Sequence, residues 1–495
     1  MSEAATFSDR ASESPSMAHR VRHAVLWRSG SQIAGQLAMW ASTFLVIRLL
    51  SPADYGLFAM TQVVLALAGL MNGYSFAGAL VQAEEVDDER IGRVFGMLIC
   101  LNFGLAAAQF AIAPAAAIYY RAPLVADMLR VQSLLHLTTP FIIMPQALLA
   151  RRIDFRTQGR VNLVAAALGA VTAPACAWAG FGAWTLVAAP LVMFVARAIG
   201  LQLVGRWWVR PRFGVGGAAA LFGMGGAMLA SDIFWFIQTQ ADTFIGGRLL
   251  DPHNLGLYTE GLFLTQILLN KFIPAINEVA FPAYARMQAD RAAVARGFLR
   301  AVRLIMLAAL PFYLGLAVTA GPLVRTVMGD HWAGAIPVVR LLALAMPFAI
   351  LQILYAPATN ALGRAGVAAR VSAAGAIVMP VAFLVAVRAG PQGMAAAWIA
   401  GAPLMAAIAS GLSLPVIGIR PSALLAAIAP ALKPALVMML GVMAIDGMLP
   451  AAVAPALRLA VLVPSGGAVY AAALLLLSRD AVAELRALIG GRSAA

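Results

Sequence analysis

The chain is dominated by apolar runs that are each long enough to cross a lipid bilayer. A transmembrane helix needs roughly 20 apolar residues, because each residue adds about 1.5 Å across a hydrocarbon core of about 30 Å. Runs of that length occur at about fourteen places. They lie near 30–50, 56–81, 91–119, 131–150, 161–180, 182–204, 218–247, 255–284, 298–320, 336–361, 367–387, 393–416, 424–448 and 457–477. We therefore predict an all-α polytopic membrane protein with about 14 transmembrane helices.

The composition agrees with a membrane protein and excludes several other classes. Hydrophobic residues make up 62% of the 495 positions and charged residues only 11%, whereas a soluble domain carries about a quarter charged residues. The net charge of +14 does not indicate a nucleic-acid partner, because the basic residues form no cluster with interleaved aromatics. Cys100 and Cys176 both fall inside apolar runs, where we expect small buried thiols and not a disulfide.

One phrase of ten residues occurs twice, 200 positions apart, at Arg48–Leu57 (RLLSPADYGL) and Arg248–Leu257 (RLLDPHNLGL). In each copy an apolar run ends in Arg-Leu-Leu, turns at a proline and restarts at Gly-Leu. This pattern predicts the tip of a helical hairpin, and its repetition predicts an internal duplication. The offset covers six runs, an even number, so the two halves have the same orientation. Many secondary transporters are built from such repeats, related by an axis along the membrane normal.

The duplication predicts two pseudo-symmetric lobes of six helices. We expect the first lobe at 27–213 and the second at 214–418, followed by two additional helices at 419–478. The remaining segments, 1–26 and 479–495, are predicted to be tails. Residues 1–22 lack the basic region, short apolar region and cleavage site of a signal peptide.

The distribution of basic residues predicts which way the chain crosses the membrane. If the N-terminus is inside, the tails and the loops after even-numbered runs hold about 25 cations, and the opposite loops hold about six. A dense example is Arg151, Arg152, Arg156 and Arg160, which all follow the fourth run. By the positive-inside rule, both termini are expected in the cytoplasm.

Charges inside the apolar runs indicate functional positions, since a charge in mid-membrane costs at least about 2.5–3.5 kcal/mol. In the eighth run Glu260, Lys271 and Glu278 fall within about 20° of one another at 100° per residue, and Asn270 and Asn277 flank this stripe. Either the stripe faces a wet cavity that binds a substrate or coupling ion, or a buried Lys–Glu pair only joins two helices. The second reading is weakened by the spacing from Lys271 to Glu278, about 10 Å along the axis.

Other polar residues in the runs allow two interpretations. Gln238 and Asp242 share a face of the seventh run, with Asp232 roughly 100° away; Asp242 near the outer end is either functional or a solvated interfacial acid. Gln32 and Gln36 in the first run either line a cavity or bond a neighbouring helix. Arg48 and Arg340 are either substrate ligands or headgroup anchors. Arg197 is close enough to the cytosolic end to snorkel.

Six phrases together resemble the Wzx-type oligosaccharide flippases, closest to the colanic-acid exporters of the multidrug/oligosaccharidyl-lipid/polysaccharide (MOP) superfamily. The phrases cover runs one to nine and are Leu49–Met60 (LLSPADYGLFAM), Ala79–Val94 (ALVQAEEVDDERIGRV), Arg151–Arg156 (RRIDFR) with Gly180–Trp184 (GFGAW), Ala241–Tyr258 (ADTFIGGRLLDPHNLGLY) and Pro274–Asp290 (PAINEVAFPAYARMQAD). The last five runs match mainly in hydropathy.

The resemblance implies a transporter of the bacterial inner membrane that moves undecaprenyl-pyrophosphate-linked repeat units by alternating access through a cationic cavity. We expect Lys271 to meet the diphosphate, with Arg48 and Arg340 next. The amide side chains in the runs are expected to bind sugar hydroxyls, and these are Gln32, Gln36, Asn270, Asn277 and Gln238. The acidic side chains are expected to bind the coupling H⁺ or Na⁺, and these are Glu278, Glu260, Asp242 and Asp232. A polysaccharide polymerase and chain-length machinery are implied partners.

No enzymatic function, cofactor or metal site is expected, because metal-ligand spacings, a nucleophile elbow and phosphate-binding loops are absent from the sequence. The main alternative is a cation-coupled drug or metabolite antiporter of the same superfamily, which would need acids in the first six runs, where no mid-run acid occurs. A major-facilitator carrier is supported only by the weak motif at 88–93. A glycan polymerase or ligase would need a large external loop, and a scaffold would not explain the polar stripe.

Overall fold

The computed structural model describes residues 35–36, 39–71, 80, 87–152, 154–205, 209–213, 218–479 and 481–484, without the side chains of 218–231 and 271–276. Within these ranges the secondary structure is helical. A short apolar helix, Met39–Leu49, precedes the longer elements. These are α2 (Pro52–Gly69), α4 (Asp88–Tyr120), α5 (Leu124–Gln132), α6 (Leu134–Arg151), α7 (Phe155–Trp178), α8 (Trp184–Gly205), α9 (Ala218–Leu249), α10 (Pro252–Arg286), α11 (Arg291–Val327), η1 (Asp330–Ala335), α12 (Ile336–Ala361), α13 (Gly366–Ala386), η2 (Val387–Ala389), α14 (Gly390–Ile417), α15 (Pro421–Met448) and α16 (Pro455–Leu477).

The predicted all-α polytopic membrane fold is confirmed. Each predicted apolar run overlaps a helix, and nine helical stretches of the described chain are long and apolar enough to span a membrane. The count of fourteen spans stays a prediction. Some helices exceed the apolar run: α11 has 37 residues because its N-cap Asp290 accepts from the amides of Ala292 and Ala293, upstream of the apolar stretch.

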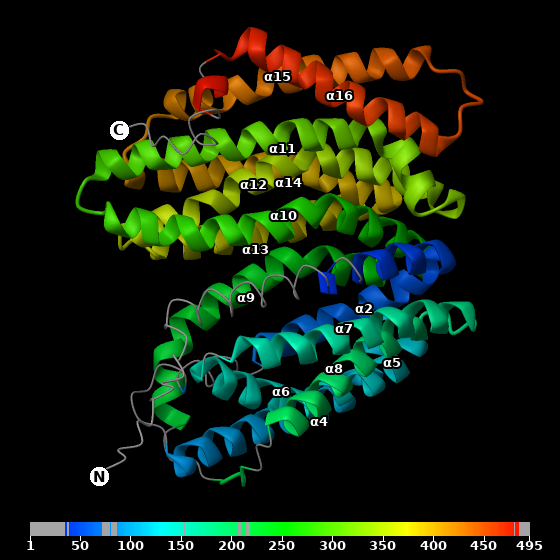
Figure 1. The fold of residues 1–495 in the computed structure, drawn as a ribbon, viewed down its shortest axis with the longest axis vertical. Coiled ribbons are helices and arrows are strands. Elements are labelled where there is room, and N and C mark those ends of the chain that lie inside the picture. Colours follow the sequence, from blue (N-terminus) through cyan, green and yellow to red (C-terminus); the bar gives the residue numbers. More distant parts are fainter. Residues whose placement is uncertain are drawn as a thin grey trace, which may run out of the picture.

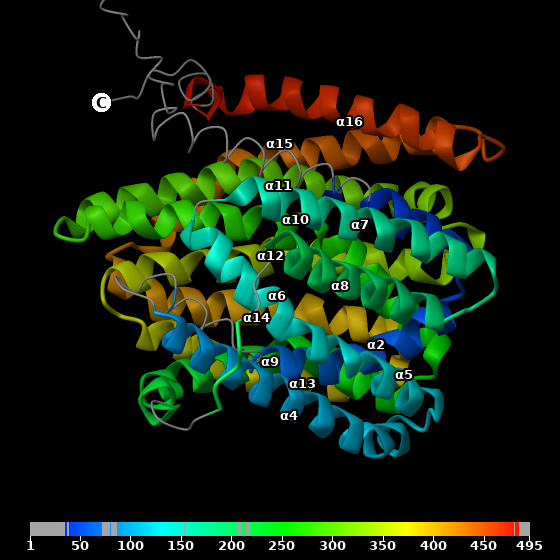
Figure 2. The ribbon, with the colours of Figure 1, turned by 60° about the horizontal axis from the view of Figure 1, so that its bottom comes forward.

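The helices form two groups that lie side by side (Figures 1 and 2). In the N-terminal group α4, α5, α6, α7 and α8 pack on one another, and in the C-terminal group α9 packs on α13, α12 on α14, and α10 and α11 on α12. The hairpin of α15 and α16 covers α11 on the outer side of the second group. The exact limits of the predicted lobes and tails stay predictions, and residues 1–26 and 485–495 lie outside the described chain.

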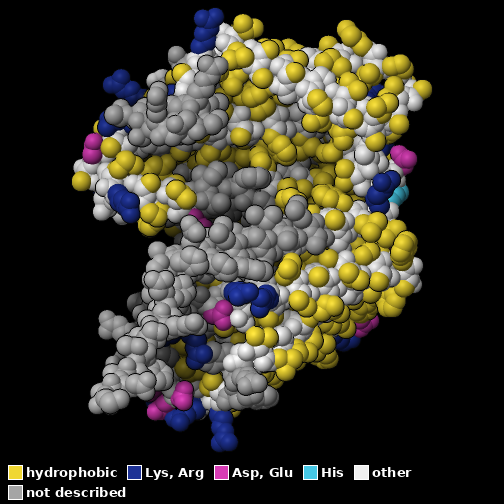
Figure 3. Space-filling model, in the orientation of Figure 1, with side chains coloured by type: hydrophobic (Ala, Val, Ile, Leu, Met, Phe, Trp, Pro, Cys, Tyr) yellow, Lys and Arg dark blue, Asp and Glu magenta, His cyan; other side chains and the backbone are white. Residues whose placement is uncertain are grey.

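The outward faces of the helices are apolar and exposed, as lipid contact requires (Figure 3). Trp178 at the end of α7 is 84% exposed and Met448 at the end of α15 is 82% exposed. The largest buried core lies in the C-terminal group, where Tyr313 and Trp332 are completely covered. Figure 3 also shows the surface hollowed between the two groups on the left, whereas the groups meet on the right.

The repeated phrase folds in the same way in both halves. Ser51 and Asp251 are N-caps whose side chains accept from backbone amides three residues later, and Pro52 and Pro252 occupy the first helical position, where a missing amide hydrogen is harmless. The sequence therefore ends one helix and starts the next at equivalent places, which confirms the predicted hairpin tips.

The two copies of the phrase also contact each other. A Cβ on Gly56 of α2 would lie 1.8 Å from the carbonyl oxygen of Pro252, and a Cβ on Gly256 of α10 would lie 1.7 Å from that of Pro52. These reciprocal clashes mean that the backbones of α2 and α10 touch, which only glycine allows. We call the end of the molecule that contains this crossing the closed end; it is the predicted outer side.

Substituting either glycine of the crossing should destabilise the closed end. We expect Gly56→Ala and Gly256→Ala each to lower the thermal unfolding midpoint, because forced overpacking costs about 1–3 kcal/mol. Gly104→Ala is the matched control: Gly104 is a helical glycine of α4 with no heavy atom within 4 Å of an added Cβ, so the better helix propensity of alanine should preserve or raise the midpoint. Equal midpoints for all three variants would show that the backbones do not touch.

Candidate functional site

Contacts on both sides of the glycine crossing seal the closed end. On one side Arg248 of α9 donates from Nη1 to the carbonyl oxygens of Ile118 (3.3 Å) and Tyr119 at the C-terminus of α4. The Tyr119 carbonyl accepts no hydrogen bond from the described backbone of α4, and both carbonyls lie at the negative end of the helix dipole, where a cation is favoured. The Tyr119 ring also stacks on Phe244 at 4.6 Å between centroids. Arg248 thus ties the two groups together.

On the other side η1 reaches from the C-terminal group to the end of the helix Met39–Leu49. The indole Nε1 of Trp332 donates to the carbonyl of Ile47 at 2.8 Å, and Nε2 of His331 lies 3.2 Å from the carbonyl oxygen of Leu50. Trp332 is fully buried and meets the ring of Tyr55 edge-on at 5.5 Å. Here too, donors from one group satisfy the terminal carbonyls of a helix in the other.

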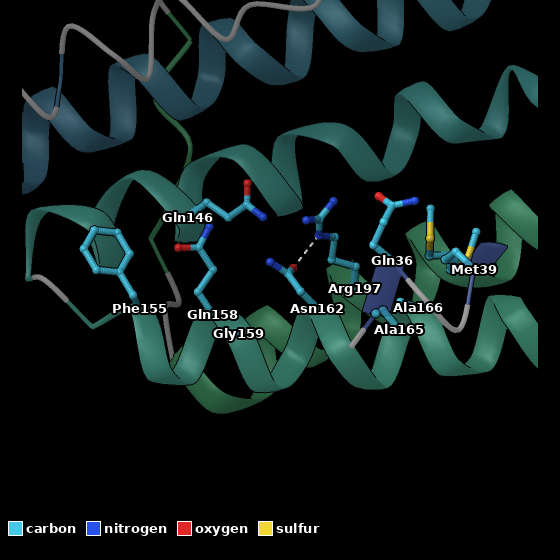
Figure 4. Close-up of a pocket in the computed structure, with 12 residues that line it drawn as sticks. Gln36, Met39, Gln146, Phe155, Gln158, Gly159, Asn162, Ala165, Ala166 and Arg197 are labelled. Atoms are coloured by element: carbon cyan, nitrogen blue, oxygen red, sulfur yellow. Dashed lines mark hydrogen bonds between the residues drawn. The ribbon is translucent and has the colours of Figure 1, made fainter. Parts of the chain in front are cut away.

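A polar pocket of about 370 Å³ lies in the N-terminal group, in the half of the molecule away from the closed end (Figure 4). We call it the Arg197 pocket. Its polar side chains come from four helical segments and include Gln36, Gln146 (α6), Gln158 and Asn162 (α7), and Arg197 (α8). Figure 4 shows these amides and the guanidinium arranged along one line, with α7 below them.

Arg197 is fixed by its neighbour on α7. Its Nε donates to Oδ1 of Asn162 at 2.6 Å. The twelve described residues that line the pocket include this one cation and no carboxylate. A planar cation among amides in a partly desolvated pocket is suited to bind an anion with several oxygens, such as a phosphate group.

A second cavity, of about 500 Å³, lies in the corresponding half of the C-terminal group. We call it the Ser413 cavity. It is lined by α9, α10, α12, α13 and α14, and Asn277, Glu278 and Ser413 are among its polar residues. Its described lining residues include no lysine or arginine. The two chambers therefore differ in charge.

Glu260 lines a third cavity, of about 280 Å³, between α10 and helices of the N-terminal group. This cavity shares Met39 and Met193 with the Arg197 pocket and also contains Tyr55, which packs in the closed end. Glu260 makes no hydrogen bond or ion pair with any described residue. A carboxylate thus lies directly beneath the seal, at the contact between the two groups.

Asp242 belongs to a buried hydrogen-bond network of α9, α10 and α14. Its carboxylate accepts from the hydroxyl of Tyr258 (2.8 Å) and from the amide and hydroxyl of Thr243 (2.6 and 3.3 Å), and the Tyr258 oxygen accepts from Nε1 of Trp398 (2.9 Å). Asp242 is only 2% exposed, so it is not the solvated interfacial acid that the sequence allowed. Each carboxylate oxygen has a donor, which fixes α9 to α10 just below the repeated turn.

The predicted stripe on α10 meets different neighbours along its length. Glu260 faces the N-terminal group, whereas Asn277 and Glu278 line the Ser413 cavity. Asn270 is exposed and lies 3.5 Å from the side-chain oxygen of Gln266. The side chain of Lys271 lies outside the described residues.

The remaining predicted residues are not brought together. Gln36 lines the Arg197 pocket, but Gln32 lies outside the described residues. Gln238 is buried against Gly375, and its Oε1 has no partner among the described atoms. Three predicted charges are exposed, namely Arg48, Arg340 and Asp232.

Sequence reasoning missed the amides that accompany Arg197. Gln146, Gln158 and Asn162 lie within or next to the fourth and fifth apolar runs, and a polar side chain in such a run usually faces the protein interior. This signal was available, but helical spacing alone does not indicate that α6 and α7 turn their amides toward a cation on α8. The position of Arg197 near the end of the sixth run suggests only snorkelling to the interface, because its partner Asn162 is on another helix.

Comparison with known proteins gives a consistent result for most of the chain. Residues 45–337 match the family model described as Polysaccharide biosynthesis protein. The succinoglycan biosynthesis transport protein ExoT of Rhizobium meliloti (strain 1021) is 29% identical over 300 residues, covering 61% of each chain. The lipopolysaccharide biosynthesis protein WzxC of Escherichia coli (strain K12) is 24% identical over 297 residues, covering 60% of each chain. The matched region thus spans about three fifths of these relatives.

A solved structure has the same fold over nearly the whole chain. The lipid II flippase MurJ in an inward closed conformation superposes with a TM-score of 0.73, at 11% identity, and covers 92% of this chain and 100% of its own. The likeness therefore extends beyond the region matched by the family model.

Removing the Tyr258 hydroxyl should destabilise the C-terminal group. In Tyr258→Phe, Asp242 loses a donor and the Trp398 Nε1 hydrogen loses its acceptor, and each buried unsatisfied group costs about 1–3 kcal/mol. We expect a lower thermal unfolding midpoint in detergent. The control is Tyr284→Phe, since Tyr284 is also buried but its hydroxyl bonds to no described residue; an equal effect of both variants would contradict a role for the network.

Proposed function

Since the chain belongs to the polysaccharide biosynthesis protein family whose model it matches over residues 45–337, we propose that it is a flippase for lipid-linked oligosaccharides. It moves repeat units carried on undecaprenyl pyrophosphate across the inner membrane, for the synthesis of exopolysaccharide, O-antigen or capsule. The family resemblance stated from the sequence is confirmed. The names of the relatives, a succinoglycan transport protein and a lipopolysaccharide biosynthesis protein, support this substrate class.

The observation that carries the proposal is the combination of a sealed end with an anion-suited pocket in the opposite half. A diphosphate with attached sugars cannot cross about 30 Å of hydrocarbon unaided. Its polyprenyl chain, however, stays in the bilayer while the head group moves through the protein. The Arg197 pocket offers a cation and several amides to that head group. A cationic drug, the cargo of the alternative antiporter, would instead require a carboxylate there.

The proposed transport cycle uses the closed end and the opposite end of the molecule in turn. In the state described here the closed end is sealed, so the head group enters from the opposite, cytoplasmic side, where both termini are proposed to lie. Release requires the Gly56–Gly256 crossing and its flanking contacts to separate while the cytoplasmic side closes. The two groups, proposed to be lobes at 27–213 and 214–418, rock against each other in this cycle. A polymerase and chain-length machinery then use the exported unit.

The remaining predicted residues keep proposed roles in this cycle. Lys271 is a proposed second ligand of the diphosphate, and exposed Arg48 and Arg340 are candidates for contacts in another state. Glu260 is the preferred site for coupling to H⁺ or Na⁺, because its carboxylate lies between the two groups beneath the seal. The other proposed coupling residues are Glu278, Asp242 and Asp232.

Arg197→Ala tests the proposal. We expect polymer export in a gene-deleted host to fall at least about tenfold at matched protein levels, since a charge-assisted hydrogen bond contributes about 1.5–3 kcal/mol and 1.4 kcal/mol corresponds to a factor of ten. Lipid-linked oligosaccharide should accumulate on the cytoplasmic leaflet at the same time. Lys271→Ala is expected to act in the same direction.

The control is Arg364→Ala, which removes an exposed cation from the loop between α12 and α13 at the same end of the molecule. It should leave export unchanged. Full export by Arg197→Ala would remove this residue from the substrate path. If the wild-type protein conferred efflux of cationic drugs and did not restore polymer export, the flippase proposal itself would be contradicted.

A further inference from the structure

The Ser413 cavity contains buried polar atoms that lack partners. Ser413 on α14 is 1% exposed, and its Oγ has no hydrogen-bond partner among the described atoms. The buried Oδ1 of Asn277 on α10 is unpartnered in the same way. Both residues line the cavity. Native proteins rarely leave buried polar atoms unsatisfied, so such atoms around one cavity indicate a ligand that supplies hydrogen bonds.

The remaining lining residues restrict the chemistry of that ligand. Trp235, Phe281 and Tyr355 provide aromatic surface, and Gln352 and Asn360 add amides that both donate and accept. Together with a hydroxyl and the carboxylate of Glu278, these groups match a pyranose ring, which has apolar C–H faces and hydroxyls around its edge. No described cation lines the cavity, so an anionic group is disfavoured.

The size of the cavity argues against a bare metal ion as the ligand. A volume of about 500 Å³ lies in the range of small-molecule sites, about 300–1,000 Å³. Oxygen ligands surround a cation such as Ca²⁺ at about 2.3–2.6 Å. A site of that kind therefore contains no empty volume comparable to this cavity. The cavity is large enough for a sugar unit with some of its bound water.

The predicted internal duplication relates the two chambers to each other. The Arg197 pocket is built by the helices of predicted runs one, four, five and six, and the Ser413 cavity by those of runs seven, eight, ten, eleven and twelve. Under the predicted duplication, runs seven, ten, eleven and twelve are the counterparts of runs one, four, five and six, whereas run eight contributes to the second chamber only. The first chamber contains a guanidinium, and the second contains a carboxylate and several aromatic rings.

We infer that the Ser413 cavity binds uncharged sugar residues of the transported glycan, while the Arg197 pocket binds the pyrophosphate. This inference rests on the proposed flippase function and assigns the two chemical parts of one substrate to the two halves of the chain. It predicts that a glycan and a short prenyl pyrophosphate protect different chambers.

Cysteine protection in the full-length protein tests this division. Ser372→Cys reports on the Ser413 cavity and Gln158→Cys on the Arg197 pocket, each in a Cys100→Ser/Cys176→Ser background reconstituted in nanodiscs; both positions are half-buried lining residues. The probes are farnesyl pyrophosphate, lipid-linked oligosaccharide extracted from the gene-deleted host, and the free oligosaccharide released from that extract by mild acid. The readout is the rate of maleimide labelling.

We expect the lipid-linked oligosaccharide to slow labelling at both positions at least fivefold. Free oligosaccharide at millimolar concentration should slow labelling at 372 only, and farnesyl pyrophosphate should slow it at 158 only. If the lipid-linked oligosaccharide protects position 158 but not position 372, the inference is overturned and the proposed function stands. The same conclusion follows if farnesyl pyrophosphate protects position 372. Protection at neither position by any probe contradicts both proposals.

A second variant tests whether the Ser413 hydroxyl, which has no partner among the described atoms, binds the sugar. Ser413→Ala, combined with Ser372→Cys, should raise the concentration of lipid-linked oligosaccharide needed for half-protection by about 3- to 10-fold, as expected for one lost hydrogen bond. When Ser413→Ala is combined with Gln158→Cys instead, protection by farnesyl pyrophosphate should not change. Ser465→Ala removes a hydroxyl at the surface of α16 and is the control. An unchanged half-protection concentration in Ser413→Ala would contradict the role of Ser413.

Discussion

The closed end depends on the absence of two side chains. Gly56 and Gly256 let the backbones of α2 and α10 touch reciprocally, and this contact brings Arg248 and Trp332 close enough to bind the terminal carbonyls of helices in the opposite group. Most carbonyls at a helix C-terminus lack partners within their own helix, so in a membrane they are satisfied either across the contact or by water that enters when this end opens. The seal is therefore formed largely by backbone polar groups, which can exchange protein partners for water when the end opens.

In the proposed flippase, the position of the seal gives each cavity its place in transport. Glu260 lies directly beneath the seal, at the contact between groups. The Arg197 pocket and the Ser413 cavity lie in the half beyond it, one in each group. A substrate with an anionic and a neutral part then has complementary chambers on either side of the path, so recognition and closure involve the same relative movement of the two groups. In this proposal the predicted duplication relates the two chambers, and their different side chains distinguish the anionic part of the substrate from the neutral part.

The sequence predicted the helices and the hairpin tips because hydropathy and capping are local properties. It predicted less about side-chain partners. Arg48 and Arg248 occupy the same place in the repeated phrase, yet Arg48 is exposed and Arg248 binds the end of α4. Helical periodicity put Glu260 and Glu278 on one face of α10, but it does not indicate that this face meets the N-terminal group at one end and the Ser413 cavity at the other. Such partners are set by helix packing between segments far apart in the chain.

In the proposed transport cycle the closed end opens to release the head group. This opening is tested with a Tyr119→Cys/Phe244→Cys pair, placed across the stacked rings in a Cys100→Ser/Cys176→Ser background. Transport of lipid-linked oligosaccharide is measured in proteoliposomes before cross-linking with a short bifunctional thiosulfonate, after it, and after reduction, with each single cysteine as control. Cross-linking the pair is expected to stop transport, and reduction is expected to restore it. Undiminished transport by fully cross-linked protein would show that the closed end does not open during transport.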